Sequence, residues 1–226
     1  MTEDFPAVAL FGDNADRHEL ADRAPILAAH LEGTNTATVD VITDQTLFTE
    51  YVDKGEKDFR ALPDYDALIL YHPSLRTLWS FNRNQLAYLE SYVEDGGGVL
   101  ALHSTLAMLP DDPHHQRLGD LLGGTIIDHG PLTDDVVVHT DDPDHPITAD
   151  LDAFTLYDEP YNLEPRADVT VHARVEHESI GTSPAIWTAA HGDGRVCYFS
   201  CGHAPRTWLD PEFRTVVERA VDWVIG

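Results

Sequence analysis

Short apolar runs alternate with longer segments of helical periodicity through the first half of the chain. Four mostly apolar runs predict strands, at residues 7–11, 37–42, 66–71 and 99–102. Between them, apolar residues recur at helical spacing over 17–31 and 82–95, which predicts two amphipathic helices. This alternation predicts an α/β fold with a parallel sheet, right-handed crossovers and helices on both faces.

The second half of the chain predicts shorter elements joined by turn-rich loops. One helix is expected over 114–122, and a last helix over 212–225. Short strands are predicted at 125–129, 135–138, 169–174, 185–189 and 196–200. No low-complexity linker or internal repeat interrupts the sequence, so we predict a single domain spanning residues 1–226.

The strand at 99–102 is the most informative of these elements. It follows the glycine triplet 96–98 and ends at His103 and Ser104. A continuous apolar run of this kind predicts a strand that is buried on both faces, as in a parallel sheet. Ligands of open α/β sheets bind just past the carboxyl ends of such strands, so we expect the chemistry at His103.

Charge is the main feature of the composition. The chain has 40 Asp and Glu residues against 14 Lys and Arg residues, which gives a net charge of −26. A dispersed acidic surface with few lysines resembles that of proteins from salt-loving organisms, in which salt screens the self-repulsion; an ordinary acidic protein is the alternative. The charge argues against nucleic-acid binding, which requires basic clusters.

Compartment and redox state are predicted from what the sequence lacks. No apolar run approaches the length of about 18 residues that a membrane helix needs, and the acidic N-terminal segment lacks the regions of a signal peptide. We therefore expect a cytoplasmic protein without membrane contacts. Cys197 and Cys201 lie four positions apart on one predicted strand, about 13 Å from each other, too far for a disulfide. Both are predicted to be buried thiols.

Several short motifs together resemble a known family. They are Gly96–His103, Leu122–Gly124, His129, Asp142–Thr148, Asp158–Asn162, Gly192–Val196, Gly202–His203 and Asp210–Phe213 with Trp223. Their order and spacing resemble the ThuA-like (trehalose utilisation) family, within the class I glutamine amidotransferase-like superfamily. The resemblance implies a three-layer α/β/α, flavodoxin-like sandwich with a mostly parallel central sheet.

The resemblance also implies a function, with one departure. In glutamine amidotransferases the corresponding strand ends in a cysteine nucleophile, whereas here it ends in His103. Without a thiolate that mechanism is unavailable, so a working glutamine amidotransferase is not expected. The family implies carbohydrate utilisation, with isomerase, lyase or hydrolase action on an oxidised (keto) disaccharide or glycoside. A non-catalytic sugar-binding or regulatory module is the alternative. A small sugar-like ligand is the expected partner, and a homodimer is the default assembly.

Three histidines and a carboxylate form the candidate catalytic set. His103, His129 and His203 each lie at the end of a predicted strand or just beyond it, and Glu159 lies in a loop that could reach them. Together these residues could hold a divalent metal such as zinc. They could equally form an acid–base set that moves protons at a sugar carbon next to a carbonyl. A structurally hydrogen-bonded histidine is the alternative for His103.

Neighbouring residues are candidates for binding the substrate. Asp158 and Glu159 are adjacent, so on an extended segment only one of them should face the pocket. Tyr161 offers a ring face and a hydroxyl to a sugar, and Asn162 offers a paired donor and acceptor. Ser104 is expected to donate a hydrogen bond or cap the next segment, because adjacent strand residues point apart and Gly-x-Ser-x-Gly is absent.

Three further candidates follow the first and third predicted strands. Asp13 and Asn14 come after the strand at 7–11, and His72 comes after the strand at 66–71. In a 2-1-3-4 strand order the ligand crevice lies between these two strands, so we expect the three residues to shape the ligand site. A helix cap is the alternative for Asp13 and Asn14.

Overall fold

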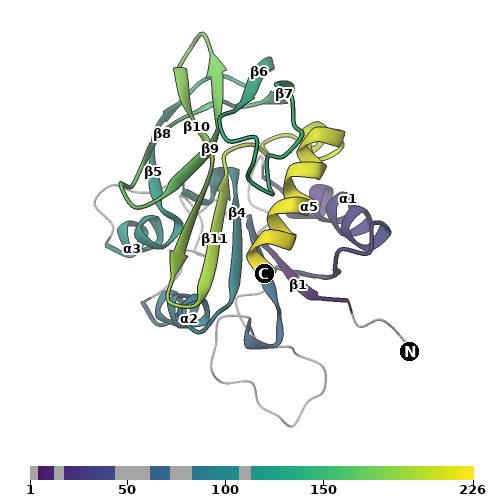
Figure 1. Ribbon diagram of the computed structural model, residues 1–226, viewed down its shortest axis with the longest axis vertical. Helices are drawn as coiled ribbons and strands as arrows, with labels where there is room; N and C mark the ends of the chain where they lie inside the picture. The colour runs from purple at the N-terminus through teal and green to yellow at the C-terminus, as the bar shows by residue number, and fades with distance from the viewer. Residues whose placement is uncertain (1–4, 13–17, 44–61, 72–82, 107–112) are drawn as a thin grey trace.

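The structure, a computed structural model, describes residues 5–12, 18–43, 62–71, 83–106 and 113–226, except for the side chains of 113–115 (Figure 1). The strands are β1 (Ala7–Gly12), β2 (Thr38–Ile42), β3 (Ala67–Tyr71), β4 (Gly98–Leu102), β5 (Gly124–His129), β6 (Thr133–Thr140), β7 (Phe154–Asp158), β8 (Tyr161–Pro165), β9 (Thr170–His177), β10 (Gly181–His191) and β11 (Gly194–Phe199). The helices are α1 (Leu20–Gly33), α2 (Arg83–Glu94), α3 (Pro113–Leu122), α4 (Pro205–Trp208) and α5 (Pro211–Ile225), with 3₁₀ turns η2 (Leu62–Asp64) and η3 (His103–Leu106). Within these described ranges no helix is long and apolar enough to cross a membrane.

The main sheet has nine strands in the order β2-β1-β3-β4-β11-β10-β9-β6-β7. The first five strands of this order, β2-β1-β3-β4-β11, pair in parallel, and they include the expected 2-1-3-4 order. The remaining pairs, along β11-β10-β9-β6-β7, are antiparallel. The fold is therefore mixed α/β, and a parallel sheet describes only its first part. The short connections from β9 to β10 and from β10 to β11 account for the change, because such connections join only antiparallel strands.

Alternate residues of the parallel strands face two separate hydrophobic clusters. On β4, Leu100 and Leu102 belong to the cluster that includes residues of α1 and α5. Val99 and Ala101 belong to the cluster that includes residues of α2 and α3. Figure 1 shows α1 and α5 together on one side of the sheet and α2 and α3 on the other. Every residue of β3 and β4 is buried, as their continuous apolar runs predict.

The strands β7 and β8 are elements that the sequence pattern does not predict. β7 pairs with β6 at the edge of the main sheet, whereas β8 pairs with β5 in a separate two-stranded sheet. Only Glu159 and Pro160 separate β7 from β8, so the chain passes from one sheet to the other at Glu159. The pairing of β5 with β8 sets His129 opposite Tyr161. The two sheets thereby bring these predicted site residues together.

Candidate functional site

His103 lies at the turn where β4 ends, with its backbone at φ +47°. This left-handed conformation is uncommon for a residue with a Cβ, and such strain concentrates at functional sites. The ring is fully buried, and its Nδ1 lies 3.0 Å from the carbonyl oxygen of Ser200. Because a carbonyl only accepts, Nδ1 carries the hydrogen and Nε2 keeps its lone pair. Burial, followed by the charges of His18 and His203, holds the pKa of His103 well below its usual range, so the imidazole is neutral.

The chain's thiols offer no nucleophile for this turn. Cys197 and Cys201 are its only cysteines, and both are free and buried, as predicted. Burial raises the pKa of both thiols, and the charge of Asp158 raises that of Cys201 further. Both groups are therefore neutral thiols at physiological pH, whereas the nucleophile of a cysteine-dependent enzyme is the thiolate.

Two further histidines lie beside the ring of His103. Nδ1 of His203 lies 3.1 Å from Nε2 of His103. His18, just before α1, brings a third ring, whose centroid lies 4.8 Å from that of His203 and 5.3 Å from that of His103. One ligand nitrogen from each of the three residues lies within 4.8 Å of the others. We call this group of His18, His103 and His203 the histidine cluster.

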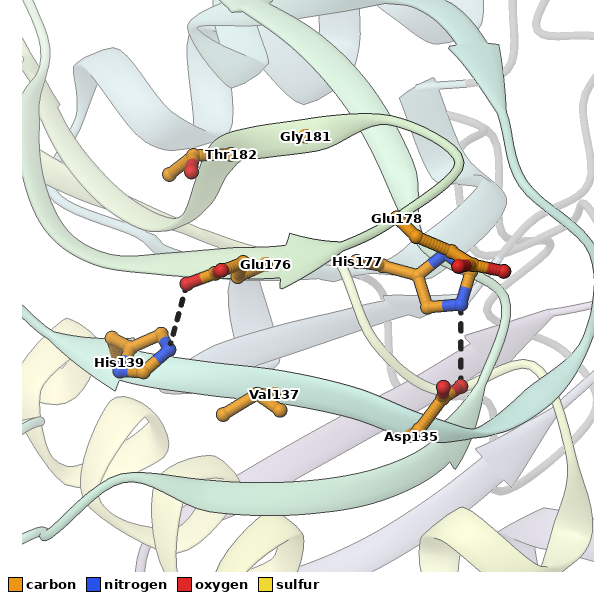
Figure 2. Close-up of a pocket in the computed structure, with 8 residues that line it drawn as sticks. All are labelled: Asp135, Val137, His139, Glu176, His177, Glu178, Gly181 and Thr182. Atoms are coloured by element: carbon orange, nitrogen blue, oxygen red, sulfur yellow. Dashed lines mark ion pairs between the residues drawn. The ribbon is translucent and has the colours of Figure 1, made fainter.

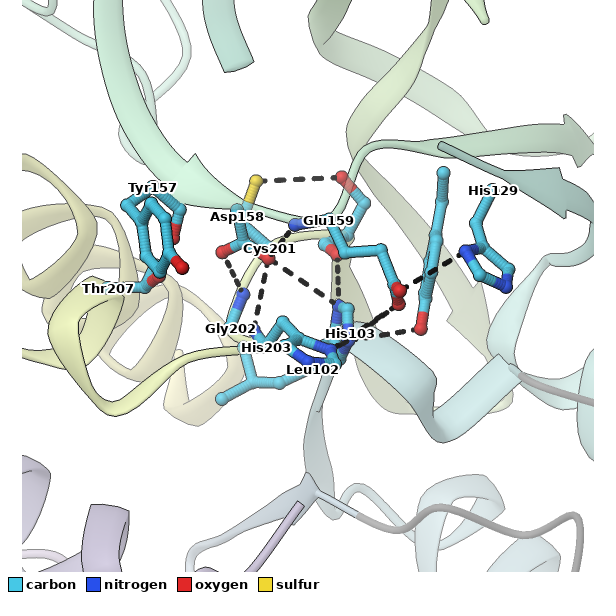
Figure 3. Close-up of polar contacts among 12 residues, drawn as sticks. Leu102, His103, His129, Tyr157, Asp158, Glu159, Cys201, Gly202, His203 and Thr207 are labelled. Carbon is cyan, nitrogen blue, oxygen red and sulfur yellow. Dashed lines mark hydrogen bonds and ion pairs between the residues drawn. The ribbon is translucent and has the colours of Figure 1, made fainter. Parts of the chain in front are cut away.

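Glu159 lies between the histidine cluster and His129, as Figure 3 shows. Its Oε2 is 3.4 Å from Nδ1 of His203 and 3.8 Å from Nε2 of His103, and its Oε1 is 3.2 Å from Nδ1 of His129. Burial acts to raise the pKa of Glu159. The hydrogen bond and charge of His203, with the charges of His129 and His18, outweigh burial and lower that pKa below its ordinary value. The side chain is therefore an ionised carboxylate beside the histidines.

Asp158 points the other way and supports the backbone beneath the site. It is fully buried; its Oδ2 accepts from the N–H of Gly202 (2.7 Å), and its Oδ1 accepts from the N–H groups of His203 (3.1 Å) and Glu159 (2.8 Å). Burial raises the pKa of Asp158 to about 6, although these backbone hydrogen bonds act to lower it. Only Glu159 of the adjacent pair thus faces Nε2 of His103, whereas Oδ1 of Asp158 lies 4.0 Å from Nδ1 on the opposite side of the ring. Both oxygens of Asp158 hold backbone groups, which differs from the predicted role in binding substrate.

Tyr161 covers the histidine cluster from β8. Its hydroxyl donates to Nε2 of His103 over 3.0 Å, and the two rings stack with centroids 4.5 Å apart. Burial, followed by the charge of Glu159, raises the pKa of Tyr161 well above its usual value, so the hydroxyl keeps its proton. Asn162 is the next residue of β8, and strand alternation turns its side chain away from the face of Tyr161. The predicted role of Asn162 in binding a sugar stays a prediction.

His129 requires a correction to the predicted metal-ligand set. Its side chain is 57% exposed, and it contacts Glu159 and the ring of Tyr161 rather than the histidines of the cluster. His18 takes its place among the nitrogens that can share a metal. The sequence carried one signal for His18, namely its position in the segment that follows β1, where ligands of α/β sheets bind. The predicted helix began at Arg17 and absorbed His18, whereas α1 begins at Leu20.

The remaining predicted residues have different outcomes. Ser104 is buried in the turn after His103, but its Oγ has no hydrogen-bond partner among the residues that the structure describes. The predicted hydrogen bond or cap is therefore not seen. Asp13, Asn14 and His72 lie outside the described residues, so their predicted roles at the crevice stay predictions.

The donor set of the histidine cluster fits a divalent transition metal. Nε2 of His103 presents a lone pair, and the carbonyl of Ser200 accepts from the other ring nitrogen, as backbone carbonyls often do for metal-bound histidines. Imidazole ligands suit zinc and related ions, and Glu159 is an ionised oxygen donor beside them. The same groups also suit proton transfer, since a neutral imidazole and a carboxylate can each accept a proton.

A depression of about 530 Å³ lies away from this site, over β6, β9 and the start of β10 (Figure 2). It contains two histidine–carboxylate pairs, His139 with Glu176 (3.4 Å) and His177 with Asp135 (3.2 Å). It shares no residue with the histidine cluster. Its His139–Glu176 pair is a useful reference for the histidine–glutamate contacts of the site.

Comparisons with known proteins agree with this architecture. A ThuA-like protein of Bacteroides uniformis superposes with a TM-score of 0.77 at 20% identity, over 99% of this chain and 93% of that chain. A ThuA-like protein of Parabacteroides merdae gives 0.74 at 14% identity, over 99% and 91%. A cytoplasmic protein of Salmonella typhimurium gives 0.66 at 19% identity, over 96% of each chain. At these identities the likeness shows a shared fold.

Sequence comparison supplies the family. Among curated proteins, no match is found. The family model described as ThuA, trehalose utilisation, matches residues 7–224, which is nearly the whole chain. The protein therefore belongs to the ThuA (trehalose utilisation) family.

Proposed function

We propose that this protein is an enzyme of carbohydrate utilisation that acts on an oxidised (keto) disaccharide or glycoside. The observation that carries the proposal is the neutral imidazole of His103, whose Nε2 faces His203, Glu159 and Tyr161. A buried strand end that gathers a lone pair, a carboxylate and a hydroxyl is suited to moving protons at a carbon next to a carbonyl. The family description supports a carbohydrate as substrate.

Each group has a distinct part in this proposal. Glu159 is ionised and accepts the proton from the sugar carbon, because it is the carboxylate in contact with the cluster. Tyr161 keeps its hydroxyl proton and can offer it to a substrate oxygen in place of His103. His129, at the exposed end of Glu159, holds the carboxylate in place through its 3.2 Å contact. This arrangement places a base and a hydrogen-bond donor on the same small site.

A divalent metal is part of the same proposal. His18, His103 and His203 would hold it, and Glu159 would lie beside it. When bound, such an ion polarises a carbonyl oxygen and so acidifies the neighbouring C–H bond. Elemental analysis of protein purified without chelators is expected to find about one divalent ion per chain, and His103→Ala is expected to lose it. Full turnover by metal-free wild-type protein would show that the metal is not required, and acid–base chemistry alone would remain as the mechanism.

The proposal is tested by turnover of oxidised disaccharides with Glu159→Gln. Glutamine keeps the size of the side chain but cannot accept the proton, so kcat/KM should fall by about 10²- to 10⁴-fold. Glu176→Gln is the matched control, because it alters a histidine–glutamate pair in the separate depression of Figure 2. Saturable binding of keto and reduced sugars without any product would favour the non-catalytic sugar-binding module instead. Unchanged turnover in His103→Ala would remove His103 from the mechanism.

A further inference from the structure

The backbone groups of Gly202 and His203 form their hydrogen bonds with side chains. The N–H groups of Gly202 and His203 both donate to Asp158. The carbonyl of Gly202 accepts from the hydroxyl of Tyr71 (3.1 Å) and from Nε1 of Trp208 (2.8 Å). All four polar backbone groups are satisfied once the carbonyl of His203 is included. Every partner is a side chain; Trp208 is near in the chain, and the others come from distant segments.

Arg23 of α1 completes this arrangement. Its Nε and Nη2 donate to the carbonyl of His203 (3.2 and 2.5 Å), and its side chain is buried. Its Nη1 donates to the carbonyl of Glu19 (2.7 Å), the residue that follows His18. One guanidinium therefore hydrogen-bonds both to the segment that carries His18 and to the segment that carries His203. A planar fork of donors in fixed geometry is what allows one side chain to hold two carbonyls.

We propose that Arg23 and Asp158 are positioning residues, which together fix His18 and His203 against His103. This inference rests on the proposed function, because it assigns how that site is assembled. The segment depends on such support, since Gly202 and His203 lie outside the helices and strands of the described residues. Arg23 acts through the backbone carbonyls of His203 and of Glu19, the neighbour of His18. Asp158 acts through the N–H groups of Gly202 and His203, and its Oδ1 also lies 4.0 Å from Nδ1 of His103, the ring nitrogen that faces away from His203 and Glu159.

Arg23→Lys is the first test, because lysine keeps the charge but replaces the fork with a single ammonium group. The readout is the ¹⁵N spectrum of the histidine rings in metal-free protein, which requires neither turnover nor a bound ion. The ring signals of His203 and His18 are expected to shift or broaden. Arg219→Lys is the matched control, because Arg219 also donates to a backbone carbonyl, that of Ala149, from α5. Unchanged ring signals in Arg23→Lys would overturn the role of Arg23.

Asp158→Asn is the second variant, with an amide N–H group in place of one accepting oxygen. Its histidine signals should change in the same way, and unchanged signals would overturn the role of Asp158. In a turnover assay, both variants should lose about 10- to 100-fold in kcat with a smaller change in KM, as substitutions of residues that orient a catalytic or ligating group typically do. A fall in stability with wild-type ring signals and wild-type kcat would reduce both residues to structural supports.

Wild-type protein gives an independent test that no folding defect can affect. The amide hydrogens of Gly202 and His203 lie outside every strand and helix, yet the buried carboxylate accepts both. We expect them to exchange with solvent as slowly as the amides of β11. Exchange at the rate of an open loop would overturn the proposal, whether or not the protein turns over a sugar.

Discussion

At the scale of single residues, the site depends on which protonation state each group is forced to take. His103 is neutral because it is buried among other ionisable rings, while Glu159 stays ionised because those rings outweigh its burial. Tyr161 keeps its proton for the same reason that His103 loses one, since burial disfavours the charged form of each. The three groups are thus set apart in acidity within one small volume, as acid–base sites require.

The neutral state of His103 predicts an acid sensitivity. Its pKa is lower in the folded than in the unfolded protein, so the unfolded state binds the extra proton and stability falls as the pH drops below about 6.5. This residue alone should lower the free energy of unfolding by at most about 1.4 kcal/mol per pH unit in that range. The measurement is denaturant unfolding of chelator-treated wild-type and His103→Gln proteins between pH 7 and 5. The free energy of unfolding should fall less steeply with decreasing pH in His103→Gln than in wild type. Equal slopes in the two proteins would contradict a buried neutral imidazole.

At the scale of elements, the last helix shows how local sequence and packing agree. Asp210 caps α5, because its Oδ1 accepts from the N–H groups of Glu212 (3.0 Å) and Phe213 (3.2 Å), and Pro211 occupies the first turn. The helix then packs closely on β4: a Cβ at Gly98 would lie 2.5 Å from the carbonyl oxygen of Val224. The strand that ends at His103 is thus held by a helix whose start is encoded locally.

Loss of this cap predicts a modest destabilisation. Asp210→Ala removes the acceptor of two N–H groups and should lower the free energy of unfolding by about 1 kcal/mol. Asp210→Asn keeps an accepting oxygen and serves as the control, with a loss of only a few tenths of a kcal/mol expected. Denaturant unfolding of the two variants measures the difference. A loss in Asp210→Asn as large as in Asp210→Ala would show that the charge, and not the cap, is responsible.

At the scale of the whole molecule, the net charge of −26 opposes the compact state. Salt screens this repulsion, because the Debye length falls from about 10 Å at 0.1 M to about 3 Å at 1 M. Thermal unfolding followed by circular dichroism at pH 7 should therefore give a Tm that rises steeply with the KCl concentration. At pH 4.5, near the sequence pI of about 4.5, the same salt series should raise the Tm much less. A flat response at pH 7 would argue against repulsion as a limit on stability.

The prediction from sequence succeeded where local pattern is sufficient. The parallel strands are continuous apolar runs, since both of their faces are buried, and this pattern needs no knowledge of the partners. β7 and β8 escaped prediction because neither has a continuous apolar run like those of β3 and β4, and each is stabilised by pairing with another strand. Such pairing is a property of the assembled sheets and leaves little trace in a short segment.

For the site, the sequence alone predicted that a candidate histidine lies at the end of a buried strand, because strand periodicity and the order of elements fix which residues reach that edge. Tertiary structure decided the rest. It brought His18 into the cluster in place of His129, turned Glu159 inward and Asp158 toward the backbone, and placed Arg23 beneath His203. These contacts join residues distant in the chain, and distance between such residues follows from how the layers pack, which no local pattern of polar and apolar positions encodes.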